Sequence, residues 1–114
     1  MKLPQISPNW PESWIKSYDF DCLEHAAPHE ARNRGYAYAY QNRFTQTLDL
    51  VRKVARPPAK VLDLAAARGN FSLSLAEQGY DVVWNDIRSD LADYVKLKYQ
   101  YGNIRYMHGN IFDI

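Results

Sequence analysis

The segment Val61-Leu62-Asp63-Leu64-Ala65-Ala66-Ala67-Arg68-Gly69-Asn70 sets the architecture that the rest of the chain must follow. It begins with a short apolar run, after which come an acid, a series of small residues and a glycine. A run of this kind predicts a buried strand over residues 60–64, and the apolar spacing that follows predicts a helix over residues 69–78. The small residues between them predict a tight turn whose backbone a ligand can approach closely.

The same alternation continues downstream of this segment. Apolar runs over residues 80–86 and 103–107 predict two further strands. Between them, Ser89 can cap a helix over residues 90–101. Strands that alternate with helices are typical of an α/β fold, in which right-handed crossovers join the strands of a parallel sheet.

The part of the chain before residue 60 has a different character. The first thirty residues contain four prolines and predict an irregular arm with one short helical turn. From residue 31 to residue 55, apolar side chains recur every three or four positions, which predicts a helix with one buried stripe that includes Tyr36 and Tyr40. Pro57 and Pro58 end this helix.

Composition excludes several classes of protein. The 114 residues suffice for one hydrophobic core, and 14 basic against 13 acidic side chains give a net charge of +1. Near-neutral charge argues against a dedicated nucleic-acid binder, and the single cysteine, Cys22, excludes an internal disulfide. No run approaches the roughly 18 apolar residues of a membrane span. We therefore expect a soluble cytoplasmic protein.

The first strand raises a question about the extent of the domain. If the three strands follow one another in one direction, residues 60–64 form an exposed apolar edge of the sheet. Parallel sheets are normally covered on both faces and seldom end in this way. We therefore expect the chain to be the front half of a larger domain, or to pair with another chain through this edge.

Polar groups that can bind a nucleoside follow all three predicted strands. The carboxyl ends of parallel strands meet at one edge of the sheet, where open α/β folds bind their ligands. The turn after Asp63 offers free backbone N–H groups, and Asp86 can accept hydrogen bonds from both hydroxyls of a ribose. Asn110 could recognise the edge of a purine.

At these residues the sequence resembles the class I S-adenosylmethionine (SAM)-dependent methyltransferases. Residues 61–72 look like the first motif of that family, in which an acid and a Gly-x-Gly-x-Gly loop lead into a helix. Residues 82–87 resemble the second motif, and residues 109–114 resemble the region that holds the adenine. The resemblance implies a Rossmann-like fold that ends here after the third parallel strand and carries an N-terminal helical extension.

The resemblance also implies a division of the chain and an activity. Residues 1–59 would form an arm and a helix that covers the cofactor, and residues 60–114 the first half of the SAM-binding domain. The activity would be transfer of a methyl group from the cofactor SAM to an acceptor that these motifs do not specify. Catalytic residues are expected beyond Ile114.

Four of the implied cofactor positions surround the methionine part of SAM. Asp63 would orient the loop and help to hold the methionine amino group, and the backbone of Ala65, Ala67 and Gly69 would line this part of the site. Alanine replaces two of the three loop glycines of the family. Because alanine resists a positive φ, we expect negative φ at both alanines.

The other four implied positions surround the adenosine part. Asp86 would bind the ribose hydroxyls, and Ile87 would pack on the adenine. Asn110, which stands where many members of the family have Asp, would contact the amino edge of the adenine together with the backbone of Ile111.

Three other features of the sequence favour structural explanations. Asp21, Cys22, His25 and His29 suggest a metal site, but a proline interrupts the helix that would align the histidines, and we predict no metal. Arg68 is expected to be a solvated loop charge. The arginines and tyrosines of residues 32–43 would suit RNA, although their regular spacing favours a packed helix over a nucleic-acid partner.

Three functions therefore compete. The leading hypothesis is a SAM-dependent methyltransferase. The second is a non-catalytic SAM-binding fragment that needs a partner chain. The third is an NAD(P)-dependent oxidoreductase, because Asp86 could bind the ribose of NAD, although the turn lacks the Gly-x-Gly-x-x-Gly pattern of that class.

Overall fold

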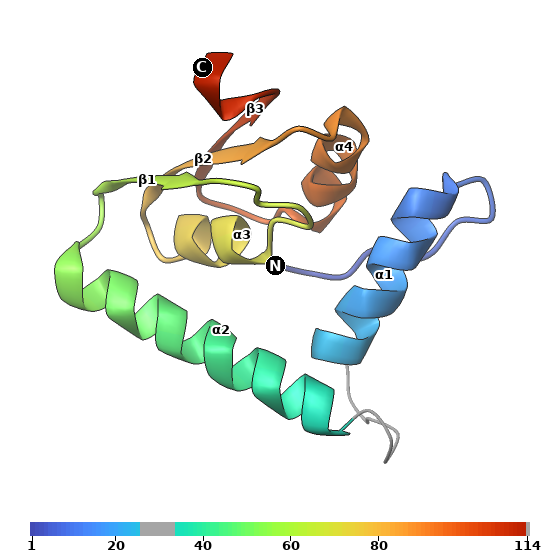
Figure 1. The fold of residues 1–114 in the computed structure, drawn as a ribbon, viewed down its shortest axis with the longest axis horizontal. Coiled ribbons are helices and arrows are strands. Elements are labelled where there is room, and N and C mark those ends of the chain that lie inside the picture. Colours follow the sequence, from blue (N-terminus) through green and yellow to red (C-terminus); the bar gives the residue numbers. More distant parts are fainter. Residues whose placement is uncertain (26–33, 114) are drawn as a thin grey trace.

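The computed structural model describes residues 1–25 and 34–113 (Figure 1), and within these ranges the predicted α/β fold is confirmed. Three parallel strands pair in the order β1-β2-β3, with Val61 beside Val82 and Val82 beside Ile104. The elements in chain order are α1 (Glu12–His25), α2 (Arg34–Val54), β1 (Lys60–Asp63), α3 (Asn70–Glu77), β2 (Asp81–Asp86), α4 (Ser89–Lys98), β3 (Asn103–His108) and a short 3-10 helix (Ile111–Asp113).

One face of the sheet carries the core. Val82 and Trp84 of β2 are fully buried under the crossover helices α3 and α4. On the other face Leu62 is 50% exposed and Met107 is 37% exposed, and Figure 1 shows no α-helix of the described residues over it. Because β1 pairs only with β2 in the described sheet, the expected exposed edge is present at β1. The pairing of this edge with another chain stays a prediction.

The N-terminal segment is more regular than predicted. The expectation of an irregular arm is wrong, because residues Glu12–His25 form the 14-residue helix α1. Pro11 directly precedes this helix, where proline is tolerated, and its carbonyl accepts bonds from the backbone N–H groups of Trp14 and Ile15. Trp14 also donates a 2.9 Å bond to the carbonyl of Asp90, so contacts with α4 fix the helix.

Helix α2 lies within the predicted residues 31–55 and packs on α3. Leu48 is buried against Leu75 and Tyr80, as the apolar spacing requires. Tyr36, which was expected in the buried stripe, is 46% exposed, whereas Ala37 and Tyr40 at the same end of α2 are buried. None of the helices in residues 1–25 and 34–113 has the length and apolar character needed to cross a membrane.

Helix α4 differs from its prediction at both ends. Ser89 is its first residue and not its cap; Arg88 takes the cap position, and no side-chain capping bond forms. The helix ends at Lys98, before residue 101, because Tyr99 is already extended. The chain then passes so close to α3 that a Cβ at Gly102 would lie 2.4 Å from the carbonyl oxygen of Ala76. The early end of α4 allows this approach.

Candidate functional site

Two adjoining hollows lie at the carboxyl ends of the strands. We call them the loop hollow, of about 330 Å³ and lined by residues 63–71 with Tyr40 and Arg43 of α2, and the strand-end hollow, of about 270 Å³ and lined by residues 85–87 and 109–111. Leu64 and Ala65 line both. All of the predicted cofactor residues line one hollow or the other: Asp63, Ala65, Ala67, Gly69, Asp86, Ile87, Asn110 and Ile111.

The backbone of the loop adopts left-handed conformations. Ala65 has φ 52°, Ala67 has φ 46° and Gly69 has φ 71°, so the expectation of negative φ at the alanines is wrong. Hydrogen bonds from neighbouring elements hold this shape: the N–H of Ala66 donates to the carbonyl of Asn85, and the N–H of Ala67 donates to Asp86, both at 2.8 Å. The loop therefore keeps a glycine-like path in spite of its alanines.

Asp63 lies at the end of β1, where it faces the start of α3. It accepts a 2.6 Å bond from the hydroxyl of Ser72. Burial raises the pKa of Asp63, the bonds from Ser72 oppose this rise, and the charge of Asp86 adds to it. Asp63 and Asp86 are the last residues of the adjacent parallel strands β1 and β2, so both lie at the same end of the sheet, as predicted.

Asp86 connects β2 to the loop and is only 7% exposed. One carboxylate oxygen accepts the N–H of Ala67 at 2.8 Å, and the other accepts the N–H of Arg88 at 2.9 Å. A carboxylate oxygen has two lone pairs, so each can accept one further hydrogen bond. The side chain can thus hold the loop and still receive two hydroxyl groups from the strand-end hollow.

The residues predicted to flank an adenine have less constrained surroundings. Ile87 is 73% exposed, and it offers an apolar surface beside the strand-end hollow. The side-chain oxygen of Asn110 accepts a 3.0 Å bond from the N–H of Phe112. Such a bond from an Asn side chain to the backbone two residues later is typical of turns, and it leaves one lone pair of that oxygen for a ligand.

A solved structure resembles this arrangement. A TehB-like SAM-dependent methyltransferase from Corynebacterium glutamicum matches with a TM-score of 0.50 and 27% sequence identity. The chain is related to the class I SAM-dependent methyltransferases. The match covers 70% of this chain and 46% of that protein, so the chain spans less than half of its length. No family model and no curated protein sequence matches the chain.

The backbone strain at Ala65 and Ala67 can be tested by substitution. An alanine in the left-handed region destabilises the folded chain by about 1–2 kcal/mol, and glycine removes most of this strain. Glycine also makes the unfolded chain more flexible, which lowers stability by about 0.4–1 kcal/mol. We therefore expect Ala65→Gly, and separately Ala67→Gly, to raise the free energy of unfolding by about 0.5–1 kcal/mol in urea titrations. A lower free energy of unfolding would contradict the left-handed assignment.

Arg68 of the same loop is not the solvated charge that was expected. Its side chain is 21% exposed, and its guanidinium donates to Asp21 and to Glu24, each at 2.8 Å. Both carboxylates come from α1 and are fully buried. The local sequence gives no sign of this contact, because the prolines of the first thirty residues predict only one short helical turn where α1 forms.

Asp21 has further partners on α3 and α4. It accepts bonds from Asn70 at 2.9 Å, from the Tyr94 hydroxyl at 2.7 Å and from Lys98 at 2.8 Å. Lys98 is fully buried and also donates to the carbonyl of Arg68 at 2.6 Å and to Asn70 at 2.8 Å. We call these residues and Glu24 the Asp21 network; its two carboxylates balance its two cations.

Burial and pairing act against each other in this network. Burial alone would raise the pKa of Asp21, but the charge of Lys98 and the bonds from Asn70, Lys98 and Tyr94 lower it below its ordinary value. Burial lowers the pKa of Lys98 to about 8, although Asp21 opposes the shift. Both groups are therefore charged near neutral pH.

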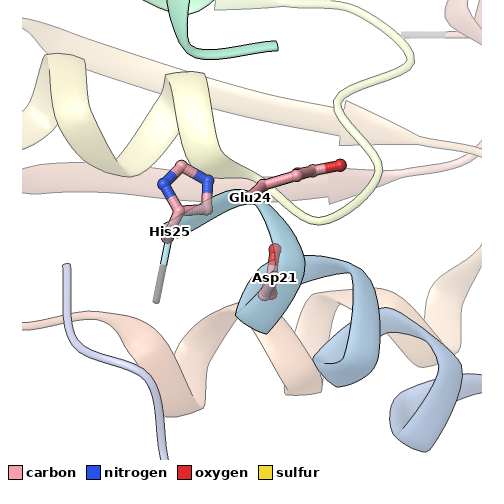
Figure 2. A group of neighbouring side chains, drawn as sticks. All are labelled: Asp21, Glu24 and His25. Carbon is pink, nitrogen blue, oxygen red and sulfur yellow. The ribbon is translucent and has the colours of Figure 1, made fainter. Parts of the chain in front are cut away.

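Figure 2 shows Asp21, Glu24 and His25 at the end of α1, the residues closest to a metal-binding arrangement. One potential ligand atom from each lies within 4.8 Å of the others. The acceptor oxygens already face Arg68 and Lys98, so a divalent ion would lie beside two cations, one of them fully buried. The geometry favours an ion-pair network over a metal site. His29, part of the cluster considered above, lies outside the described residues.

His25 makes the stability of the fold sensitive to acid. Its ring nitrogen lies 3.1 Å from the Tyr40 hydroxyl, and burial lowers the pKa of His25 although Asp21 and Glu24 oppose the shift. When the folded pKa lies below the unfolded value of 6.5, the unfolded chain takes up the proton first. We therefore expect the free energy of unfolding to fall as the pH decreases below about 6.5.

This pH effect can be assigned to one residue. Urea unfolding between pH 7.5 and pH 5 should show the decline in the unaltered chain and a flatter profile in His25→Gln. Asp21 acts in a separate window, since its lowered pKa affects stability only below about 4. An unchanged profile in His25→Gln would assign the decline to another group.

Proposed function

We propose that the chain binds SAM along the loop hollow and the strand-end hollow, and that it takes part in methyl transfer from SAM to an acceptor. One observation carries the proposal: the predicted cofactor residues, far apart in sequence, line two hollows that share Leu64 and Ala65. The similarity to a SAM-dependent methyltransferase supports the same assignment.

In this proposal each hollow receives one part of the cofactor. The loop hollow takes the methionine part, with Asp63 toward its ammonium group; Arg43 lines the same hollow, and its charge suits the carboxylate. The strand-end hollow takes the adenosine part, with the free lone pairs of Asp86 toward the ribose hydroxyls. Ile87 and Ile111 supply apolar walls for the adenine.

The chemical demand on the protein is mainly one of alignment. SAM supplies a methyl group made electrophilic by the attached sulfonium. The chain must therefore hold both ends of the cofactor rigidly, so that an acceptor can approach in line with the methyl group. The hydrogen bonds from Ala66 to β2 and from Ala67 to Asp86 provide this rigidity.

Asp86→Ala tests the assignment most directly. It should weaken binding of S-adenosylhomocysteine (SAH), the demethylated form of SAM, by at least about tenfold, because bonds to a charged acceptor are worth about 1.5–3 kcal/mol. Isothermal titration calorimetry measures the affinity. Asp81→Ala is the matched control, since it removes a carboxylate from the opposite end of the same strand.

A loss of loop structure must be separated from a loss of ribose contacts. The unaltered chain should prefer adenosine to 2′,3′-dideoxyadenosine, and Asp86→Ala should abolish this preference. Full SAH binding by Asp86→Ala would contradict the site assignment. Binding of NADH without binding of SAH would favour the oxidoreductase instead.

A further inference from the structure

Helix α1 contacts the lining of the proposed cofactor site at Tyr40, through His25, and at the end of the loop, where the charged contacts lie. Asp21 bridges Arg68 and Asn70 through a single oxygen, at 2.8 and 2.9 Å. Glu24 holds the second nitrogen of the Arg68 guanidinium at 2.8 Å. The loop is thus attached to α1 immediately after its left-handed alanines.

The attachment also extends to the backbone of the loop. Lys98, which pairs with the other oxygen of Asp21, donates to the carbonyl of Arg68 at 2.6 Å. Asp21, Glu24 and Lys98 are fully buried and Arg68 is 21% exposed, so water has little access to these bonds. A loop that keeps two alanines in an unfavourable backbone region needs such outside restraint.

We propose that Asp21 is a positioning residue for the cofactor loop: by holding Arg68, Asn70 and Lys98, it keeps residues 65–69 in the conformation that binds SAM. The inference rests on the proposed function. It explains two unusual features together: alanines stand where the family motif has glycines, and α1 carries buried charges. The N-terminal helix is then part of the cofactor site, although it does not line either hollow.

The coupling runs in both directions. If docking of α1 favours the binding conformation of the loop, cofactor binding must favour docking of α1 by the same factor. SAH should therefore slow hydrogen exchange at the amides of α1 as well as at residues 65–70. A purely structural role for Asp21 would leave exchange in α1 unaffected by SAH.

The first experiment removes the contacts of Asp21, here called the anchor of the loop, without leaving an unbalanced charge. Asp21→Asn combined with Lys98→Met deletes one charge of each sign and leaves the Arg68–Glu24 pair. At a temperature where circular dichroism shows both proteins folded, we expect this paired variant to bind SAH about tenfold more weakly than the unaltered chain. Ser13→Ala is the matched control, because it breaks the 2.6 Å bond of α1 to Asp90 and leaves the loop untouched.

The second experiment tests whether the anchor compensates for strain in the loop. In a protein that carries Ala65→Gly and Ala67→Gly, positive φ at these positions no longer strains the backbone. Adding Asp21→Asn with Lys98→Met to this protein should therefore weaken SAH binding by less than about threefold. Equal losses of affinity in both backgrounds would overturn this explanation of the anchor.

The possible outcomes separate the two proposals. If the unaltered chain does not bind SAH, the proposed function fails. If the unaltered chain binds SAH and the paired variant binds it equally well, the positioning role alone is overturned. Equal weakening by the paired variant and by Ser13→Ala would also overturn it, since any loosening of α1 would then suffice.

Discussion

Replacing Lys98 by Met is expected to lower the free energy of unfolding by about 3–5 kcal/mol, since removal of one partner leaves a buried charge without compensation. In the unaltered chain, Asp21 and Glu24 balance Arg68 and Lys98, and three of these four residues are fully buried. Without Lys98, two carboxylates would face one guanidinium. Urea unfolding followed by circular dichroism at pH 7 measures the loss.

The paired variant, Asp21→Asn with Lys98→Met, is the control for this prediction. It restores the charge balance, so it should lose less stability than Lys98→Met alone, even though it has one substitution more. If the paired variant is the less stable of the two, the hydrogen bonds of the network outweigh its charges. A loss below about 1 kcal/mol for Lys98→Met would show that Lys98 is not buried in an ion pair.

Gly69→Ala should be comparably damaging, for two independent reasons. The residue has φ 71°, where an alanine costs about 1–2 kcal/mol. An added Cβ would also lie 2.7 Å from one methyl carbon of Val95 and 3.0 Å from the other, and overpacking of this kind costs about 1–3 kcal/mol. We expect a total loss of about 3 kcal/mol in the free energy of unfolding.

Gly35→Ala is the matched control for this second prediction. It introduces the same methyl group within helix α2, where none of the residues that the structure describes lies within 4 Å of the new Cβ. Because alanine is the better helix former, this variant should gain about 0.5–1 kcal/mol. Adding Val95→Ala to Gly69→Ala should remove the clash and leave the backbone cost. If Gly69→Ala is tolerated without loss, α4 does not pack on the loop as described.

Gly69 has a packing role besides the cofactor contact that the motif implies. The motif places its backbone against the methionine part of the cofactor. The structure adds that its missing side chain lets the loop lie against α4, which carries Lys98. The affinity of Gly69→Ala for SAH therefore reports on packing as well as on direct contact.

Local pattern was sufficient to predict the α/β core. The apolar run at residues 61–64 predicted a strand and the period of α2 predicted a helix, and both elements form; β1 is less buried than expected, with Leu62 and Leu64 about half exposed. The candidate site followed from the same source, because parallel strands bring their carboxyl ends to one edge of the sheet whatever the side chains are. Asp63, Asp86 and Asn110 therefore came out at one edge of the sheet, as predicted.

The length of α1, the partners of Arg68 and the backbone conformation of the loop alanines were decided by tertiary structure alone. Arg68 pairs with Asp21, 47 positions away, and no local pattern in the sequence indicates which distant carboxylate will meet a given cation. The left-handed alanines likewise persist because β2 and Asp86 bond to the loop from outside and offset an unfavourable local preference. Periodicity reports which face of a segment is buried; the partners across that face appear only when the chain has folded.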